Sequence, residues 1–373
     1  MLRFLLPAIG ILLILHGSCR NPRSMNAYSP SHADIKWSGR YLKSNSEEVF
    51  LVGSAASLKF RFKGDKCIIR IKNLASPGQH HYLSWVLDGI HSGRKPVRSE
   101  ANDHLVVEAL NQKEIHEIEV FKETEPSCGF ISIGKIEVEE ILPASDLQKK
   151  KIEFIGNSIT AGMSSDASIV PCGGGGPCDQ HNAFESYGAL TARNLNLDFM
   201  ISAVSGIGVY RNSASAFPVM RDLYESTALT GSESDPPWDF NSFVPDIVCI
   251  NLGTNDFSDA GGDPQRLPFD SSLFISKYIE LLTLINNHYP ESSFILLQHS
   301  MSGVHYMDVL SKCLDSVKHQ FAQLKPNKSI EVFAFSASAG NGCYGHPDVA
   351  EHRRMAGELS EFLIQRFGRF DPD

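Results

Sequence analysis

Short apolar segments alternate with longer stretches of helical periodicity through the second part of the chain. The segments with the length and composition of strands are 152–155, 197–202, 246–252, 294–298 and 330–334. The stretches with helical spacing are 183–194, 214–225, 272–288, 306–323 and 347–366. Helical crossovers between successive strands produce a parallel sheet with helices on both faces. The pattern therefore predicts a three-layer α/β/α domain with five parallel strands.

The first part of the chain has the pattern of an all-β domain. Short runs with alternating apolar residues, such as SLKFRFKG and KCIIRIKN, follow one another between residues 35 and 142. Turn residues separate these runs, for example at Asp88-Gly89. This spacing is typical of a β-sandwich of the jelly-roll kind. We therefore predict a jelly-roll domain over residues 35–145 and the α/β domain over residues 146–373, with residues 20–34 as a tether.

Residues 1–19 have the features of an export signal. Arg3 precedes an apolar run over residues 4–15, and small residues precede Cys19. The run is shorter than the roughly 20 residues that span a bilayer, and it matches a secretory signal. The segment also resembles a bacterial lipoprotein signal with a lipid on Cys19; an ordinary signal peptide cut nearby is the alternative. Both interpretations predict export to the periplasm, the cell surface or the medium, with membrane contact only through a lipid anchor at Cys19.

The sequence indicates neither a nucleic-acid partner nor a nucleotide cofactor. Its formal net charge is −9, whereas nucleic-acid-binding domains normally carry a basic field. The glycine-rich stretch between Cys172 and Cys178 does not contain the G-x-x-x-x-G-K-[ST] pattern of a phosphate-binding loop. We therefore expect a protein without a cofactor.

Eight cysteines are present, so seven remain besides Cys19. An odd number argues against a disulfide framework that uses every cysteine. Cys172 and Cys178 are close in sequence, and we predict a disulfide between them that closes a small loop. Metal binding is the competing interpretation, but the nearby Asp179 and His181 do not complete a convincing set of ligands.

Polar groups follow several of the predicted strands at their carboxyl ends. The relevant motifs are Gly156-Asn157-Ser158, Ser205-Gly206, Gly253-Thr254-Asn255 and, before the last helix, Gly345-His346-Pro347. Ligands of open α/β sheets bind outside the carboxyl ends of the strands. We therefore expect these motifs to meet at one edge of the sheet.

Together these groups form the set that acyl transfer requires. A serine hydroxyl becomes a nucleophile when a base removes its proton, and His346 is the candidate base for Ser158. The negative oxygen of the tetrahedral intermediate needs donors that are fixed in advance. The backbone N–H groups of Ser158 and Gly206 and the side-chain amide of Asn255 are the candidates for this oxyanion hole.

The chain resembles an SGNH/GDSL-type hydrolase, because Ser158, Gly206, Asn255 and His346 match the four landmark residues of that superfamily in the same order. Further stretches resemble carbohydrate esterase family 2, namely FESYGALTARNL, SGIGVYRN, WDF, INLGTND and GCYGHPDVAEHRRMA. That family joins a jelly-roll domain to an SGNH domain and removes O-acetyl groups from plant polysaccharides. The resemblance implies that the α/β domain has the flavodoxin-like fold of SGNH hydrolases. The resemblance implies a metal-independent serine carboxylic-ester hydrolase of the acetylxylan esterase type, acting on acetylated hemicellulose polysaccharide or oligosaccharide such as xylan or glucomannan.

One departure from the superfamily concerns the group that orients the histidine. Many members carry an Asp three residues before the histidine, or in some cases two, but Cys343 and Tyr344 occupy those positions. The acid of a triad mainly fixes the tautomer and orientation of the imidazole. We therefore predict a Ser158–His346 dyad, with a backbone carbonyl near the turn at residues 343–345 holding the other ring nitrogen.

Several interpretations remain open at this point. Trp238 either belongs to the core or stacks on a sugar ring beside the cleft. The first alternative function is another SGNH activity, such as a lipase-like enzyme, a thioesterase or a peptidoglycan O-acetylesterase. The second is a carbohydrate-binding surface protein whose esterase site has decayed.

Overall fold

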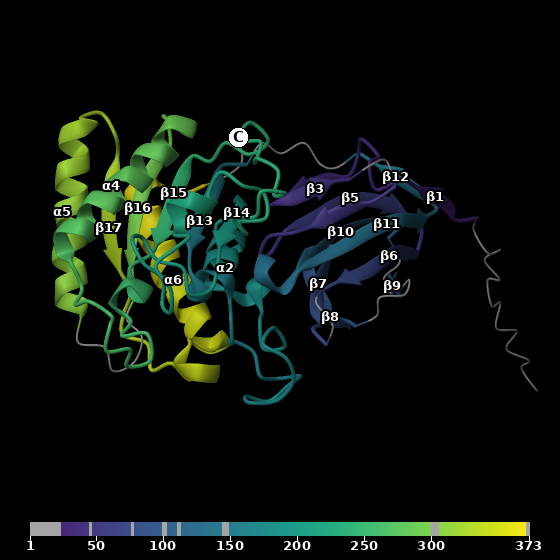
Figure 1. Cartoon of the computed structure of the whole chain (residues 1–373). Coiled ribbons are helices and arrows are strands. Elements are labelled where there is room, and N and C mark those ends of the chain that lie inside the picture. The colour runs from purple at the N-terminus through teal and green to yellow at the C-terminus, as the bar shows by residue number, and fades with distance from the viewer. Residues whose placement is uncertain are drawn as a thin grey trace, which may run out of the picture.

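A computed structural model describes residues 24–44, 47–75, 78–98, 103–109, 113–143, 149–299 and 306–370. Two domains lie side by side, an N-terminal β-sandwich and a C-terminal α/β domain (Figure 1). The predicted export signal at residues 1–19 and the predicted domain boundary after residue 145 lie outside the described residues.

Two antiparallel six-stranded sheets form the N-terminal domain. One contains β1 (Asn26–Tyr28), β3 (Tyr41–Lys43), β4 (Val49–Leu51), β6 (Lys66–Leu74), β9 (Asp103–Glu108) and β11 (Phe130–Val138). The other contains β2 (Lys36–Ser38), β5 (Ser57–Lys63), β7 (His81–Leu87), β8 (Ile90–Val97), β10 (Ile115–Lys122) and β12 (Glu140–Leu142). Alternate residues of β5 and β6 are buried, and Phe60, Phe62 and Ile69 belong to one apolar core. The predicted sandwich is confirmed.

The prediction that residues 20–34 form a tether is wrong for part of this range. Strand β1 pairs antiparallel with β11, and Ala27 lies opposite Glu137. Residues 24 and 25 are exposed, and residues 20–23 lie outside the described part of the chain. Three residues are too few for a sequence pattern to indicate a strand, so the pairing with β11 could not be read from composition.

A five-stranded parallel sheet is the centre of the C-terminal domain. Its strands are β13 (Lys151–Gly156), β14 (Asp198–Ala203), β15 (Ile247–Asn251), β16 (Ser293–Gln298) and β17 (Ile330–Ala334). The spatial order is β14-β13-β15-β16-β17, which is the order of flavodoxin-like sheets and confirms the fold class that the resemblance implied. Strand β13, whose carboxyl end carries Ser158, lies between two neighbours and therefore has a fixed position.

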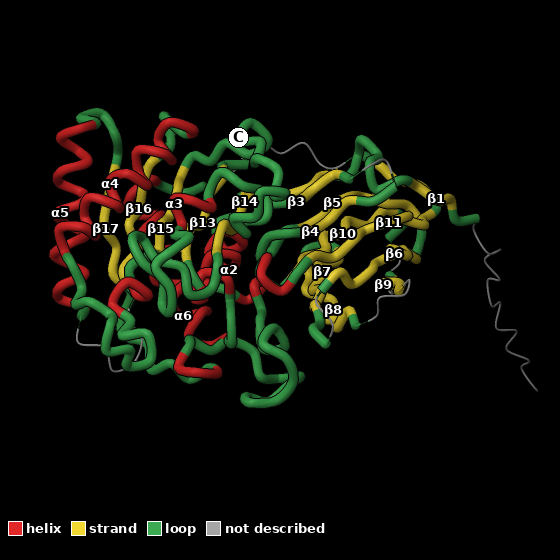
Figure 2. The backbone as a smooth tube through the Cα atoms, viewed as in Figure 1, coloured by secondary structure: helices red, strands yellow, loops and turns green. Residues whose placement is uncertain are grey.

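Helices cover both faces of this sheet, and Figure 2 shows them gathered in the C-terminal domain. The α-helices are α1 (Ser158–Ala161), α2 (Tyr187–Asn194), α3 (Met220–Leu223), α4 (Ser271–His288), α5 (Met307–Leu324) and α6 (Val349–Phe367). The 3-10 helices are η1 (Pro126–Cys128), η2 (Ala183–Glu185), η3 (Thr254–Phe257) and η4 (Cys343–Gly345). Helices α2 and α6 share one apolar core with the sheet, and α4 and α5 share another. No helix of the described residues is long and apolar enough to cross a membrane.

The helix predicted over residues 214–225 is largely absent, because only α3 forms there. Pro218 lies within the predicted range and disfavours helical geometry in the residue before it. The side chain of Asn212 donates a hydrogen bond to the carbonyl of Pro218 at 2.7 Å. This contact closes a loop where the apolar spacing alone indicated a helix.

The sandwich packs against β14, the edge strand of the parallel sheet. The buried guanidinium of Arg40 donates hydrogen bonds to the hydroxyl of Ser202 at 2.9 Å and to the carbonyl of Tyr224 at 3.0 Å. The ring of Phe121 stacks on that of Phe199 with their centroids 6.3 Å apart. The N-terminal domain therefore protects an exposed sheet edge and brings its own loops to the carboxyl end of β14.

Candidate active site

The nucleophile candidate lies on a sharp turn between β13 and α1. Asn157 caps α1, and its side chain accepts a hydrogen bond from the N–H of Ile159 at 3.1 Å. A Cβ atom on Gly156 would lie 2.1 Å from the hydroxyl of Thr160, so the turn requires glycine at this position. Ser158 is the first residue of α1, and its side chain lies at the carboxyl edge of the sheet.

The structure brings His346 to this serine. The imidazole follows η4, and its Nε2 lies 2.9 Å from the Oγ of Ser158. This separation is that of an ordinary hydrogen bond. The two residues that the sequence placed at one edge of the sheet are therefore in direct contact, across 188 positions of the chain.

The other ring nitrogen of His346 is held less firmly. Burial lowers the pKa of His346, while the carbonyls of Cys343 and Tyr344 act in the opposite direction. These are carbonyls of the turn that the sequence predicted to orient the ring. Within the described residues, however, Nδ1 is buried and no acceptor meets the distance and angle of a hydrogen bond. The packing of the η4 turn therefore has to fix the orientation of the imidazole.

The predicted disulfide between Cys172 and Cys178 is wrong. Cys172 is bonded to Cys343, and Cys178 is bonded to Cys128. The intervening glycine-rich loop turns the two cysteines toward different neighbours, so that closeness in sequence did not decide the pairing. One bridge ties residue 172 to the turn before His346, and the other ties residue 178 to the N-terminal domain.

The oxyanion candidates lie on two adjoining loops. Gly206 has a φ of +78°, and a Cβ there would lie 2.9 Å from the hydroxyl of Ser213. The side-chain amide of Asn255 donates one hydrogen bond to the carbonyl of Ile207 at 2.8 Å. An amide nitrogen carries two hydrogens, so the second remains for an oxyanion. The third candidate donor, the N–H of Ser158, lies at the start of α1.

Asp256 anchors the loop that follows Gly206. Its carboxylate accepts hydrogen bonds from the backbone N–H groups of Val209 at 3.0 Å and Tyr210 at 2.9 Å. Burial raises the pKa of Asp256 to about 6, although these N–H groups act in the opposite direction. This residue adjoins Asn255, and its contacts bind the two oxyanion loops to each other.

Two residues near the site, Glu125 and His181, were not identified as functional candidates from the sequence. Glu125 comes from the N-terminal domain, and its Oε2 accepts a hydrogen bond from the N–H of Ser205 at 2.7 Å. The Nε2 of His181 lies 3.6 Å from the Oε1 of Glu125, which is longer than a hydrogen bond. Neither residue is part of a recognisable sequence motif. The contact between Glu125 and Ser205 depends on how the two domains dock, and the sequence does not show this.

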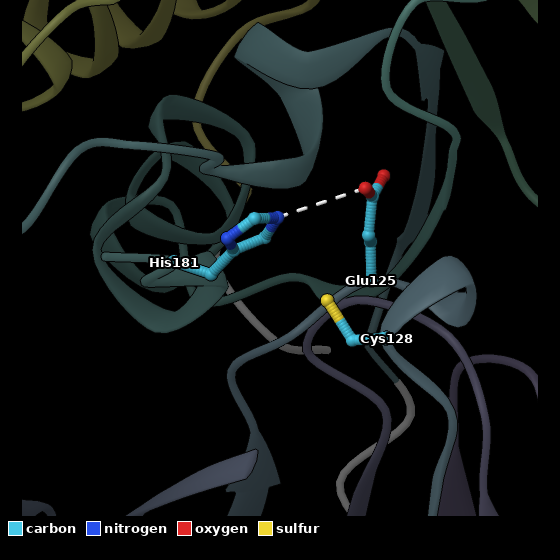
Figure 3. A group of neighbouring side chains, drawn as sticks. All are labelled: Glu125, Cys128 and His181. Carbon is cyan, nitrogen blue, oxygen red and sulfur yellow. Dashed lines mark ion pairs between the residues drawn. The ribbon is translucent and has the colours of Figure 1, made fainter. Parts of the chain in front are cut away.

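Glu125, His181 and Cys128 bring three potential ligand atoms within 4.8 Å of one another (Figure 3). Metal coordination by cysteine requires the thiolate. The sulfur of Cys128 is already bonded to Cys178, so the donor set does not fit a metal centre. The cluster is instead a carboxylate and an imidazole beside a disulfide.

Trp238 is not placed to stack on a sugar. Its side chain packs with Met200 and Phe243, and only 7% of the residue is exposed. The guanidinium of Arg40 lies 5.2 Å from the centroid of its ring. Trp238 therefore belongs to the domain interface, and the prediction of a substrate contact is wrong.

A pocket of about 380 Å³ adjoins the oxyanion loop. Its wall includes Ser205, Gly206 and Ser213 of the C-terminal domain and Ser127 of the N-terminal domain. A larger pocket of about 770 Å³ lies near the amino ends of β13 and β15, lined in part by Lys151 and Ile247. That end of the sheet is opposite the serine and the histidine, so the smaller pocket is the one associated with the candidate site.

Both domains match described families. Residues 37–144 match the family described as "Carbohydrate esterase 2 N-terminal". Residues 154–354, more than half of the chain, match the "GDSL-like Lipase/Acylhydrolase family". The second match includes Ser158, Gly206, Asn255 and His346.

Two curated relatives have similar sequences. "Cellulase/esterase CelE" of Acetivibrio thermocellus is 28% identical over 347 residues, which cover 90% of this chain and 40% of CelE. An "Acetylxylan esterase / glucomannan deacetylase" of Cellvibrio japonicus is 27% identical over 226 residues, covering 59% of this chain and 61% of that enzyme. The chain thus spans less than two thirds of the length of either relative.

Solved structures resemble the whole two-domain arrangement. A family two carbohydrate esterase from Clostridium thermocellum, in complex with cellohexaose, has a TM-score of 0.77 and 26% identity, with 90% of this chain and 99% of that chain covered. An acetyl xylan esterase from Butyrivibrio proteoclasticus, Est2A, has a TM-score of 0.80 and the same fold at 19% identity, with 93% and 100% covered. The chain therefore belongs to the GDSL-like lipase/acylhydrolase family and has the two-domain architecture of the family 2 carbohydrate esterases.

Proposed function

We propose that the protein is a carbohydrate O-acetylesterase that removes acetyl groups from acetylated hemicellulose such as xylan or glucomannan. The observation that carries this proposal is the 2.9 Å contact between the Oγ of Ser158 and the Nε2 of His346. The relatives named as acetylxylan esterases and glucomannan deacetylases support the substrate class.

In the proposed reaction, His346 accepts the proton of Ser158 as its oxygen attacks the acetyl carbonyl. The carbonyl oxygen becomes negative and is bound by the N–H groups of Ser158 and Gly206 and the amide of Asn255. The C–O bond to the sugar then breaks, and His346 returns its proton to the departing sugar hydroxyl. Water attacks the acetyl-serine in the same way, which releases acetate and restores the enzyme.

The environment of the histidine supports its role as the base. Because burial lowers the pKa of His346, the imidazole is neutral near pH 7 and can accept a proton. The pocket beside Gly206 is lined by hydroxyls, such as that of Ser213, and by apolar side chains, such as that of Leu229, and this mixture suits a sugar ring that carries a small acyl group. We place the sugar that carries the acetyl group at this pocket.

Acetate release from acetylated xylan and glucomannan tests the proposal. Ser158→Ala and His346→Ala should each reduce kcat by about 10³-fold or more, since the hydroxyl and its base act as a unit. Circular dichroism and the melting temperature would establish that the variants fold. Unchanged acetate release in Ser158→Ala would contradict the mechanism, and a wild-type protein that releases no acetate would favour a decayed site.

The length of the acyl group distinguishes the proposed function from other esterases of the same family. For esters of one alcohol, kcat/KM should decrease steeply as the acyl group lengthens from acetyl to octanoyl. A preference for long chains would favour a lipase-like enzyme. A preference for acetylated peptidoglycan over acetylated xylan would change the polysaccharide but retain the chemistry.

We also propose that the chain is exported, either with a lipid on Cys19 or after cleavage nearby. Residues 1–19 and the two disulfides support this proposal, because disulfides persist mainly in oxidising compartments. Mass spectrometry of the mature N-terminus would identify a lipid on Cys19. A cytoplasmic protein with an intact N-terminus would contradict the proposal.

A further inference from the structure

We propose that Glu125 is a positioning residue for the oxyanion hole and acts through the N–H of Ser205. The inference depends on the proposed esterase function and extends it to the N-terminal domain. Glu125 follows β10 in the sandwich, whereas Ser205 follows β14 in the α/β domain. The domain that precedes the enzyme fold would then be part of the catalytic apparatus.

The contact reaches the residue directly before the oxyanion donor. The Oε2 of Glu125 accepts the N–H of Ser205 at 2.7 Å, and the next N–H along the chain is that of Gly206. Because peptide groups are planar, only the φ and ψ torsions of Ser205 separate these two N–H groups. Fixing the peptide group at Ser205 therefore fixes the direction in which Gly206 donates.

Other contacts hold this turn from its far side. The carbonyl of Gly206 accepts the N–H of Ser213 at 2.8 Å, and the carbonyl of Ile207 accepts the amide of Asn255 at 2.8 Å. Glu125 contacts the near side. A loop held from both sides keeps its donor in place before the negative charge develops, which is the condition for effective stabilisation.

Glu125 is itself held and charged. Only 3% of the residue is exposed, and its Oε1 accepts the hydroxyl of Ser127 at 2.7 Å. Burial acts to raise the pKa of Glu125, but His181, Ser127 and Ser205 together lower it below its usual value. Figure 3 shows the ring of His181 directed at the carboxylate. A charged acceptor makes a stronger hydrogen bond to Ser205 than a neutral one.

The segment around Glu125 is also attached by contacts that do not involve the Glu125 carboxylate. The ammonium group of Lys122 donates to the backbone carbonyls of Thr124 and Glu125. The disulfide between Cys128 and Cys178 joins the same segment to the C-terminal domain. Substitution of the Glu125 side chain should therefore leave the two domains docked.

The experiment compares Glu125→Gln and Glu125→Ala with Glu123→Gln. Glu123 is a buried carboxylate two positions earlier, which contacts Arg94 and Ser84 rather than the oxyanion loop. Kinetics with an acetyl ester would be measured beside the melting temperature. The second readout is the rate at which a fluorophosphonate reacts with Ser158, because its phosphoryl oxygen occupies the oxyanion hole.

The expected order of kcat is wild type, then Glu125→Gln, then Glu125→Ala. Glutamine keeps an oxygen that accepts from Ser205 and should lose about 5- to 10-fold, whereas alanine should lose about 100-fold, the lower limit for a missing oxyanion donor. KM should change by less than about twofold, because the contact serves the transition state rather than substrate binding. Phosphonylation should slow in the same order.

The pH profile separates this role from a structural one. Glu125 raises the pKa of His346, so Glu125→Gln should move the acid limb of kcat/KM to lower pH. The other titratable groups that interact with this imidazole, His181, His299 and His352, are retained in the variant.

Three outcomes would overturn the inference. The first is that both Glu125 variants keep the kcat and the phosphonylation rate of the wild type. The second is that Glu123→Gln loses as much kcat as the Glu125 variants. The third is that activity in the Glu125 variants falls only in proportion to the loss of folded protein, while the acid limb of the kcat/KM profile stays at the same pH. A wild-type protein that reacts with the probe but hydrolyses no ester would contradict the proposed function alone. Failure of the wild type to react with the probe would overturn both.

Discussion

A carboxylate five residues after His346 holds the loop that leads to this histidine. Glu351 lies in the first turn of α6, where it completes a capping box with Asp348. Its carboxylate accepts hydrogen bonds from the N–H groups of Ala339 at 2.7 Å and Asn341 at 2.9 Å. The loop that leads into η4 is therefore attached to the helix that follows the histidine.

Glu351→Gln should reduce stability in a pH-dependent way. Burial acts to raise the pKa of Glu351, but the N–H of Asn341, the hydroxyl of Ser338 and other donors lower it from 4.5 to about 2. A lowered pKa in the folded state means that the stabilisation is complete above about pH 4.5 and is lost as the pH falls toward 2. We expect the melting temperature of the variant to fall by about 3–6 °C at pH 7, since hydrogen bonds to charged groups contribute about 1.5–3 kcal/mol.

The difference between wild type and Glu351→Gln should shrink as the pH falls below 4. Glu361→Gln is the matched control, because Glu361 is an exposed acid on the same helix. A constant difference from pH 7 to pH 2.5 would contradict this assignment of the charge.

At the scale of elements, η4 combines a strained residue with a covalent link. Tyr344 has a φ of +57°, a conformation that is unfavourable for a tyrosine. The N–H of Cys343 donates to the carbonyl of Ser164 at 2.8 Å, and its sulfur is bonded to Cys172. Because the Nδ1 of His346 has no hydrogen-bond acceptor among the described residues, this attachment stabilises the turn that orients the imidazole.

Replacement of Cys172 and Cys343 together by serine should therefore affect catalysis as well as stability. Loss of a disulfide typically costs about 2–4 kcal/mol, and we expect a lower melting temperature. The additional expectation is a decrease of kcat of about 10-fold at temperatures where the variant is fully folded, because a misplaced catalytic group slows proton transfer. Kinetics and thermal unfolding on the same samples would measure both effects.

Cys313→Ala provides the control for the disulfide variant, since Cys313 is a buried thiol of α5 that forms no bridge. It should lose some stability and keep its kcat. If the double serine variant also kept its kcat, the packing around η4 would be sufficient without the covalent link.

The elements differ in how far the sequence could predict them. The strands of the parallel sheet were predicted to within two residues, because each is a short apolar segment bounded by polar residues. The contact between Ser158 and His346 followed, since both come after elements that end at the same edge. The disulfides could not be predicted in this way. Cys172 and Cys343 are 171 positions apart, and only the folded chain brings their Cα atoms to 5.3 Å.

The docking of the two domains could not be predicted from the sequence for a similar reason. Nothing in the pattern around Glu125 indicates which loop of the sandwich meets β14. Trp238 was ambiguous because its place depends on Arg40, which lies almost 200 residues earlier. Contacts of this kind depend on the docked surface, and local periodicity carries no information about it. At the scale of the whole molecule, the interface is therefore what the structure adds.

That interface contains a buried cation. Arg40 is fully buried, and it donates hydrogen bonds to Ser202, Tyr224 and Ser226 of the C-terminal domain. Burial lowers the pKa of Arg40, and the carboxylate of Glu153 acts in the opposite direction. Breaking such a network from one side leaves a buried charge and several acceptors without partners.

Arg40→Met should loosen the two domains from each other. We expect a loss of about 3–5 kcal/mol, because the variant leaves Glu153 buried without its cation. Arg61→Met is the control, since Arg61 lies on β5 and contacts only the carbonyl of Pro143 within its own domain among the hydrogen bonds of the described residues. Calorimetry should show one unfolding transition in the wild type and the control, and a separate earlier transition in Arg40→Met.

Because Glu125 reaches the oxyanion loop across the same interface, esterase activity should disappear with the earlier transition. Activity that persisted until the later one would mean that the α/β domain works without its neighbour.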